Sequence, residues 1–195
     1  MSDGSHSFLI LPGLGNSGPD HWQSVWEAEL PRARRIDLGL WDRPVGEAWV
    51  ERAAAAIEDN PGAVLIGHSL GAVLVTLVAA ARPDLDIGGA LLVAPADVES
   101  SARTPDFLRA FAPIPDQPLP FPAVVVASRN DPYMNFARAR DLAGAWGADL
   151  VDAGPAGHIN VASGYGPWPE GRRLLGRLTP RRVPVLAEQQ ASRRV

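Results

Sequence analysis

Short apolar runs alternate with amphipathic stretches from residue 8 to about residue 178. Apolar runs of about four to eight residues between turn-forming residues are typical of buried strands, and apolar residues spaced three or four apart are typical of helices. The runs predict strands at 8–11, 34–38, 63–67, 89–94, 123–127 and 149–152. The amphipathic stretches predict helices at 20–30, 45–59, 70–81, 136–146 and 169–178.

Strands that alternate with helices along the chain imply βαβ crossovers and a mostly parallel sheet. A length of 195 residues without an internal repeat fits one domain. We therefore predict a single three-layer α/β/α domain over residues 1–195, with flexible ends at 1–6 and about 184–195. The proline-rich segment 100–121 is predicted to be a loop with one or two helical turns.

The composition removes several classes of chemistry. The chain has no cysteine, which excludes disulfides, thiolate metal sites and cysteine nucleophiles. All 18 basic residues are arginines, so Schiff-base lysines and the phosphate-loop lysine are excluded as well. We expect neither a cofactor nor a metal.

Charge and hydropathy narrow the expected partners and location. A net charge of −4 does not favour nucleic-acid binding. No apolar stretch reaches the length of about 18 residues that a membrane span needs. The first seven residues lack a signal-peptide pattern, so the expected location is the cytoplasm.

The strongest chemical signal is the pentapeptide Gly67-His68-Ser69-Leu70-Gly71 between a predicted strand and a predicted helix. The pattern G-x-S-x-G in this setting is a nucleophile elbow, in which a sharp turn exposes the serine above the sheet. Glycines are needed two positions to either side because a side chain there would collide with neighbouring backbone. The alternative is a tight turn whose Ser69 only caps the helix.

A serine nucleophile needs a general base, and the chain has four histidines. His6 lies in the N-terminal tail, and His68, inside the elbow, is expected to pack or to bond locally. His158 follows the last predicted strand in a loop with flanking glycine, where ligands meet open α/β sheets. We therefore predict His158 as the base, and His21 as a residue that shapes the first loop and the substrate pocket. The alternative for His158 is an ordinary surface histidine.

The carboxylate that orients the base has two candidates, which both follow strands in the order Ser, Asp, His. Asp131 follows the fifth predicted strand, and Asp97 follows the fourth. We favour Asp131, because it precedes the histidine loop by one strand and helix and can reach it from an adjacent strand. The alternative for Asp131 is a turn aspartate, which the sequence Asp-Pro often marks.

An acyl-transfer intermediate also needs backbone donors for its oxyanion. One predicted donor is the N–H of Leu70, which directly follows the nucleophile. The other comes from the loop 12–15 after the first strand, where we favour the N–H of Leu14.

The same loop contains a formal dinucleotide-binding pattern, with glycines at 13, 15 and 18 and Asp37 at the end of the second predicted strand. However, Pro19 favours a helix start near Asp20, which leaves Gly18 outside the helix. The carboxylate of Asp20 would also repel a pyrophosphate. These features favour the oxyanion loop over a nucleotide site.

These residues resemble small α/β-hydrolases of the retinoblastoma-binding protein nine type. The resemblance rests on 11–13 with 16–17 and 21–22, on 67–71, on 128 with 130–132, and on 157–160 with 163–164 and 168–169. It implies a minimal six-stranded hydrolase core in the order 2-1-3-4-5-6, with Ser69, Asp131 and His158 as a triad. It also implies serine hydrolase, esterase or peptidase-like activity. Retinoblastoma-type binding is not expected, because its Leu-x-Cys-x-Glu motif requires the absent cysteine.

Four aromatic residues are candidates for the walls of the site. The interval 97–122 is too short for a lid domain, so we predict an open, shallow site with Phe107 and Phe111 covering one side. Trp22 and Trp168 lie close in sequence to the first and last catalytic loops and are predicted to line an acyl pocket. Core packing is the alternative for both tryptophans.

The sequence thus predicts a serine hydrolase that acts on a small-molecule carboxylic ester or thioester, in preference to an amide. The alternative is a non-catalytic binding protein on a hydrolase fold.

Overall fold

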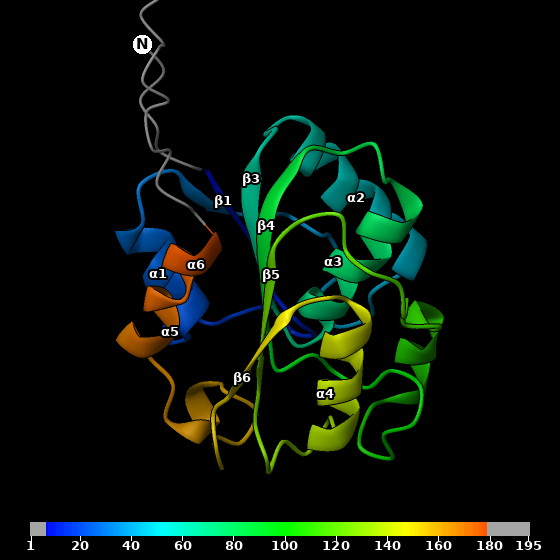
Figure 1. The fold of residues 1–195 in the computed structure, drawn as a ribbon, viewed down its shortest axis with the longest axis vertical. Helices are drawn as coiled ribbons and strands as arrows, with labels where there is room; N and C mark the ends of the chain where they lie inside the picture. Colours follow the sequence, from blue (N-terminus) through cyan, green and yellow to red (C-terminus); the bar gives the residue numbers. More distant parts are fainter. Residues whose placement is uncertain (1–6, 179–195) are drawn as a thin grey trace, which may run out of the picture.

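The computed structural model describes residues 7–178, so the predicted flexible ends lie outside the described residues. Within these described residues, six strands form one sheet, and every neighbouring pair is parallel. The strands are β1 (Phe8–Leu11), β2 (Ala33–Arg35), β3 (Ala63–His68), β4 (Ile87–Val93), β5 (Ala123–Ala127) and β6 (Asp149–Asp152). Their order is β2-β1-β3-β4-β5-β6, as expected (Figure 1).

Helices cover both faces of the sheet and complete the predicted three layers (Figure 1). One face holds α1 (Trp22–Glu29), α5 (Pro169–Arg173) and α6 (Leu175–Leu178). The other holds α2 (Gly46–Glu58), α3 (Leu70–Ala81) and α4 (Phe136–Ala145). Two 3₁₀ turns, η1 (Asp106–Phe111) and η2 (Val161–Ser163), lie in the connections.

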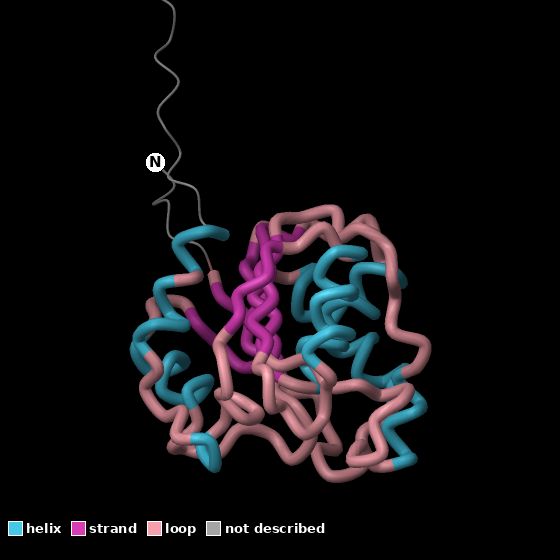
Figure 2. Tube along the Cα trace, turned by 60° about the horizontal axis from the view of Figure 1, so that its bottom comes forward, coloured by secondary structure: helices cyan, strands magenta, loops and turns pink. Residues whose placement is uncertain are grey.

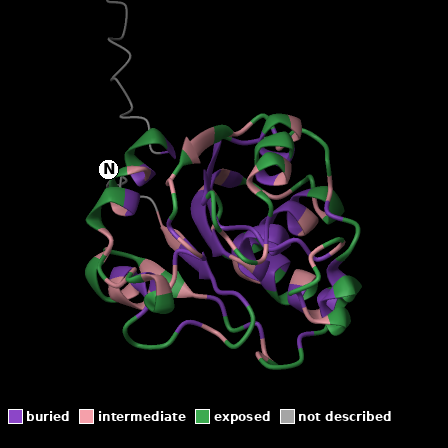
Figure 3. Ribbon diagram, turned by 90° about the horizontal axis from the view of Figure 1, so that it is seen from below, coloured by how far each residue is buried: buried purple, intermediate pink, exposed green. Residues whose placement is uncertain are grey.

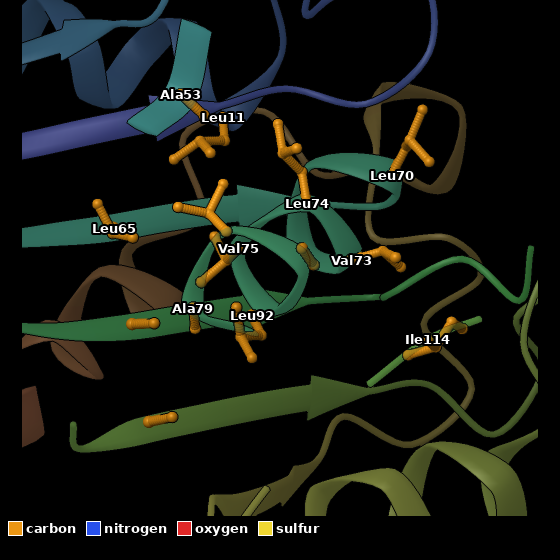
Figure 4. Close-up of a cluster of buried hydrophobic side chains, with 14 of the residues drawn as sticks. Leu11, Ala53, Leu65, Leu70, Val73, Leu74, Val75, Ala79, Leu92 and Ile114 are labelled. Carbon is orange, nitrogen blue, oxygen red and sulfur yellow. The ribbon is translucent and has the colours of Figure 1, made fainter. Parts of the chain in front are cut away.

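The core follows from the alternation of side chains along the strands. In β3, Leu65 packs in the cluster beneath α2, α3 and α4, whereas Val64 and Ile66 pack in the cluster beneath α1 and α6. Both faces are covered, so β3 is buried along its whole length (Figure 3). Helix α3 is buried over most of its surface, and Figure 4 shows Leu74 and Val75 of this helix beside Leu11 and Leu65 of the strands.

The bounds of most predicted elements agree with the structure to within two residues, and two elements differ more. The helix predicted at 169–178 is divided into α5 and α6 at Leu174, and the glycines at 171 and 176 weaken a continuous helix here. Strand β2 ends at Arg35 rather than at Leu38, because its partner β1 ends at Leu11 and Pro12 has no N–H to extend the ladder.

The parallel sheet places the carboxyl ends of all strands at one edge, where long loops gather (Figure 2). The loops after β1, β3, β4, β5 and β6 contain every residue that the sequence singles out as catalytic. Within residues 7–178, no helix combines the length and the apolar character that a membrane crossing demands.

Candidate active site

The turn between β3 and α3 has the geometry of a nucleophile elbow. Ser69 adopts φ 57° and ψ −120°, a conformation that residues other than glycine rarely occupy. A Cβ on Gly67 would lie 2.7 Å from the Cα of Ala72, and one on Gly71 would lie 2.0 Å from the carbonyl oxygen of Leu11. Glycine is therefore required at both positions, as predicted from the sequence.

The structure brings Ser69, His158 and Asp131 into one hydrogen-bonded chain. Nε2 of His158 lies 2.9 Å from Oγ of Ser69. Nδ1 of the same ring lies 3.0 Å and 2.9 Å from the two carboxylate oxygens of Asp131. The side chains of His158 and Asp131 are 9% and 2% exposed, so water competes little for these bonds. This arrangement can deprotonate a serine hydroxyl.

Asp131 and its competitor Asp97 have different partners. Oδ1 of Asp131 also accepts from the backbone N–H of Tyr133 at 2.9 Å, which fixes the carboxylate toward the imidazole. Asp97 is buried and lies beside Arg138, with Oδ2 3.1 Å from Nε. Its Oδ1 accepts from the N–H groups of Glu99 and Ser100. Asp97 therefore holds the start of the loop after β4.

Residues next to Asp131 in sequence hold the histidine loop in place. Oγ of Ser128 accepts from the N–H of Ala156 at 3.0 Å. Oδ1 of Asn130 accepts from the N–H of Gly157 at 2.7 Å. These contacts were not anticipated as positioning contacts, although both residues belong to the block on which the family resemblance rests.

His68 packs against the rings of His21 and Trp22, as one of its two expected roles requires, but its hydrogen bond is not local. Its Nε2 lies 2.9 Å from the carbonyl oxygen of His158, which is distant in sequence, and because that oxygen can only accept, Nε2 is the donor. Its ring centroid is 4.9 Å from that of His158. His68 therefore supports the backbone of the histidine loop from beneath.

His21 begins α1, where its Nδ1 accepts from the backbone N–H of Gln23 at 3.1 Å. Burial, followed by the nearby Arg35 and His158, lowers the pKa of His21 to about 4. Burial, and after it the same neighbour His158, lowers the pKa of His68 well below its usual value. Both rings are therefore neutral at neutral pH, with the proton of each on Nε2.

The loop after β1 packs directly on the elbow. A Cβ on Gly13 would lie 2.8 Å from the Cβ of Ser69, so this approach requires glycine. Oδ1 of Asn16 accepts from Nη1 of Arg35, and the N–H of Gly15 donates to the carbonyl oxygen of Trp41. In residues 7–178, the backbone N–H groups of Leu14 and Leu70 donate to no protein group. Both residues line the cavity above Ser69 and are thus available to an oxyanion.

A cavity of about 290 Å³ opens beside Ser69. Its walls come from the loops after β1, β3, β4, β5 and β6. The lining residues are Gly13, Leu14, Asn16, His21, His68, Ser69, Leu70, Ala96, Arg103, Thr104, Pro105, Leu108, Tyr133, His158 and Asn160. Five residues were predicted to form the substrate pocket in addition to the triad and the oxyanion donors. Of these five, His21 lines the cavity.

Trp22 and Trp168 lie outside the cavity lining, which corrects the prediction of an acyl pocket built from them. Trp22 is fully buried, and its Nε1 donates to the carbonyl oxygen of Ile159 at 2.9 Å. Trp168 stacks on Trp26 with ring centroids 5.7 Å apart. Core packing between α1 and the segment after β6 is thus the role of both rings. Through Ile159, Trp22 also supports the residue next to His158.

Phe107 and Phe111 also lie outside the cavity lining, which corrects the prediction that they cover one side of it. Phe111 is buried against Trp49, with centroids 5.6 Å apart, and Phe107 is exposed. Leu108, on the same 3₁₀ turn, reaches the cavity instead. The two phenylalanines are four positions apart, which places them together on an α-helix but not on the tighter η1 turn.

The glycines at 13, 15 and 18 lack the close contact between helix and sheet that a dinucleotide-binding motif has at its third glycine. Gly18 precedes the helix cap at His21, and a Cβ on Gly18 would have nothing within 4 Å. The third glycine is thus not pressed between helix and sheet. Among residues 7–178, no group of three or more His, Asp or Glu side chains is arranged to hold a metal ion.

Comparison with known proteins adds independent information. A family model described as "Serine hydrolase" matches residues 8–177. The chain is 36% identical, with a TM-score of 0.78, to a protein from Pectobacterium atrosepticum described as a YdeN-like hydrolase. That alignment covers 90% of this chain and 91% of the other. No curated protein matches the chain.

More distant solved structures share the fold. The ydeN gene product of B. subtilis is 20% identical with a TM-score of 0.71, over 89% of this chain and 98% of the other. Est1E from Butyrivibrio proteoclasticus is 12% identical with a TM-score of 0.65, over 91% and 90% of the two chains. At these identities the likeness concerns the fold alone.

Proposed function

Because this chain belongs to the serine hydrolase family, we propose that it hydrolyses a carboxylic ester or thioester through an acyl-enzyme on Ser69. The observation that carries the proposal is the chain of contacts from Oγ of Ser69 through His158 to Asp131. A serine at an elbow, a base within reach of its hydroxyl and a buried carboxylate behind the base are the parts that acyl transfer needs.

In the proposed first half-reaction, Oγ of Ser69 attacks the substrate carbonyl carbon while Nε2 of His158 takes the hydroxyl proton. The negative charge that develops on the carbonyl oxygen is bound by the N–H groups of Leu14 and Leu70. Asp131 stabilises the imidazolium and keeps its Nδ1–H in place. The intermediate then collapses, His158 gives its proton to the leaving oxygen or sulfur, and the acyl group remains on Ser69.

The second half-reaction repeats these steps with water. Nε2 of His158 takes a proton from the water as its oxygen attacks the acyl carbon, and the same two N–H groups hold the oxyanion. Collapse breaks the bond to Oγ of Ser69, which recovers the proton from His158, and the carboxylic acid leaves. The lowered pKa values of His21 and His68 keep these rings neutral, so they do not take the proton that His158 accepts in this cycle.

The cavity size favours small acyl groups. Its volume of about 290 Å³ is just below the roughly 300–1,000 Å³ range of small-molecule sites. Its lining includes Leu14, Leu70 and Leu108 as apolar walls, and residues 7–178 form no separate domain over its mouth. We therefore place short-chain esters ahead of long-chain lipids.

A series of p-nitrophenyl esters tests this proposal. We expect kcat/KM to rise from acetate to about hexanoate and to gain nothing further at decanoate, because each buried methylene contributes about 0.8 kcal/mol and those beyond the cavity stay in water. Release of p-nitrophenolate measures each rate, and the p-nitroanilide of butyric acid provides the amide comparison. Faster cleavage of the anilide than of the butyrate ester, or no cleavage of any ester by folded protein, would contradict the proposal.

A further inference from the structure

The cavity beside Ser69 has one feature that ester hydrolysis alone does not use. Among residues 7–178, Arg103 is the single lining residue with a permanent charge, and no Asp or Glu lines the cavity. The low pKa values of His21 and His68 keep these two rings uncharged at neutral pH. The cavity is therefore locally positive in a chain whose net charge is −4.

The guanidinium of Arg103 is available to a ligand. Within residues 7–178, no carboxylate forms an ion pair with it, whereas Arg82, Arg129, Arg138 and Arg172 each pair with Asp or Glu. An arginine donates five N–H groups in a planar fork that matches the two oxygens of a carboxylate. Its exposed position at the cavity wall lets it reach a substrate without a large desolvation cost.

A second polar group in the same wall lacks a partner. Thr104 is 8% exposed and lines the cavity, and its Oγ1 is buried without a hydrogen-bond partner in the part of the chain that the structure describes. A buried hydroxyl without a partner is costly, and a rotation of the Thr104 side chain that turns Oγ1 toward a ligand oxygen in the cavity would satisfy it.

The segment with these two residues is fixed in place rather than loosely attached. The N–H of Arg103 donates to Oγ of Ser101, and the N–H of Thr104 donates to the carbonyl oxygen of Ser101. On the far side, Arg109 donates to the carbonyl oxygen of Glu99, which closes the segment onto itself. Buried Leu108 connects it to the core.

From these contacts we propose that the substrate has a carboxylate, which Arg103 binds with its guanidinium and Thr104 with its hydroxyl. The inference rests on the proposed function, since it names the substrate class of the same site. It assigns to the loop after β4 the selection of anionic esters over neutral ones. Ser69, His158 and Asp131 act on the ester carbonyl regardless of this charge.

Two matched pairs of esters test the inference and show on which side of the scissile bond the carboxylate lies. Mono-p-nitrophenyl adipate and its neutral methyl ester differ in charge on the acyl side, and 4-acetoxybenzoate and its methyl ester differ on the leaving side. Background hydrolysis measured with Ser69→Ala is subtracted from each rate. In one of the pairs we expect kcat/KM of the anionic ester to exceed that of the neutral ester by about five- to tenfold, the modest gain typical of an exposed charge-assisted contact.

Variants distinguish direct binding of the carboxylate by Arg103 from a general effect of the protein's net charge. Arg103→Gln is expected to reduce the anionic preference to about one, and Arg103→Lys to keep part of it, because a point charge replaces the fork. Arg173→Gln makes the same change in net charge on exposed α5 and is expected to leave the preference unchanged. Salt at 0.5 M is expected to weaken the preference in the wild type.

The outcomes distinguish this inference from the proposed function. Turnover of the neutral esters without an anionic preference in either pair, or a preference that Arg103→Gln leaves intact, overturns the inference alone. If folded wild type turns over none of the four esters above the Ser69→Ala background, the proposed function fails and the inference with it.

Discussion

Replacement of Ser69 with alanine is expected to lower kcat for p-nitrophenyl butyrate by about 10⁶-fold, the loss measured when a serine nucleophile is removed elsewhere. The variant loses the attacking oxygen and nothing else in the site, because alanine keeps the Cβ that faces Gly13. Residual turnover is limited to what the backbone donors and binding provide. The measurement is the initial rate at saturating ester, with circular dichroism as the control for folding.

A double variant tests whether Ser69 and His158 act together in lowering the activation barrier. His158→Gln alone is expected to cost nearly as much as Ser69→Ala, and the two changes together no more than either one. Such non-additivity is expected because base and nucleophile act as one unit. Ser24→Ala, which removes a hydroxyl that donates to backbone oxygens next to the first loop, is the matched control and is expected to stay active. Additive losses in the double variant would contradict a shared proton transfer.

Replacement of Asp131 with asparagine is expected to lower kcat by about 10⁴-fold, since the amide can no longer hold the imidazole as the required tautomer or stabilise its positive charge. The near-isosteric change preserves the acceptor for the N–H of Tyr133. Steady-state kinetics from pH 6 to pH 9 on folded protein measure the loss.

Asp97→Asn is the control that discriminates between the two carboxylates of the sequence argument. The amide oxygen can still accept from the N–H groups of Glu99 and Ser100, and the loss is the ion pair with Arg138. We expect kcat within about tenfold of wild type, or about 1.4 kcal/mol in activation free energy. If Asp97→Asn abolishes turnover in a folded protein while Asp131→Asn does not, the assignment of the acid is wrong.

The fold was predictable because its sheet is parallel and covered on both faces. A strand such as β3 then appears as a continuous apolar run, and α3 follows it directly through the elbow. The boundaries that differed, at β2 and at α5 with α6, depend on a partner strand and on two glycines rather than on a local apolar pattern.

The chemistry of the site was more predictable than its walls. Ser69, Asp131 and His158 each follow a strand, and parallel strands place such residues at one edge. The wall residues depend on which side of a short irregular segment faces inward. The sequence between β4 and β5 has no periodicity that distinguishes Leu108 from Phe111. His68 likewise has no local signal, because its partner is the distant carbonyl of His158.

Labelling with a fluorophosphonate tests directly whether Ser69 is an activated nucleophile, without any assumption about the substrate. We expect one adduct per chain by intact-mass spectrometry, located on Ser69 by peptide mapping and absent from folded Ser69→Ala. No adduct on folded wild type would instead favour a binding protein on a hydrolase fold. An adduct that persists in Ser69→Ala would place the reactive group elsewhere.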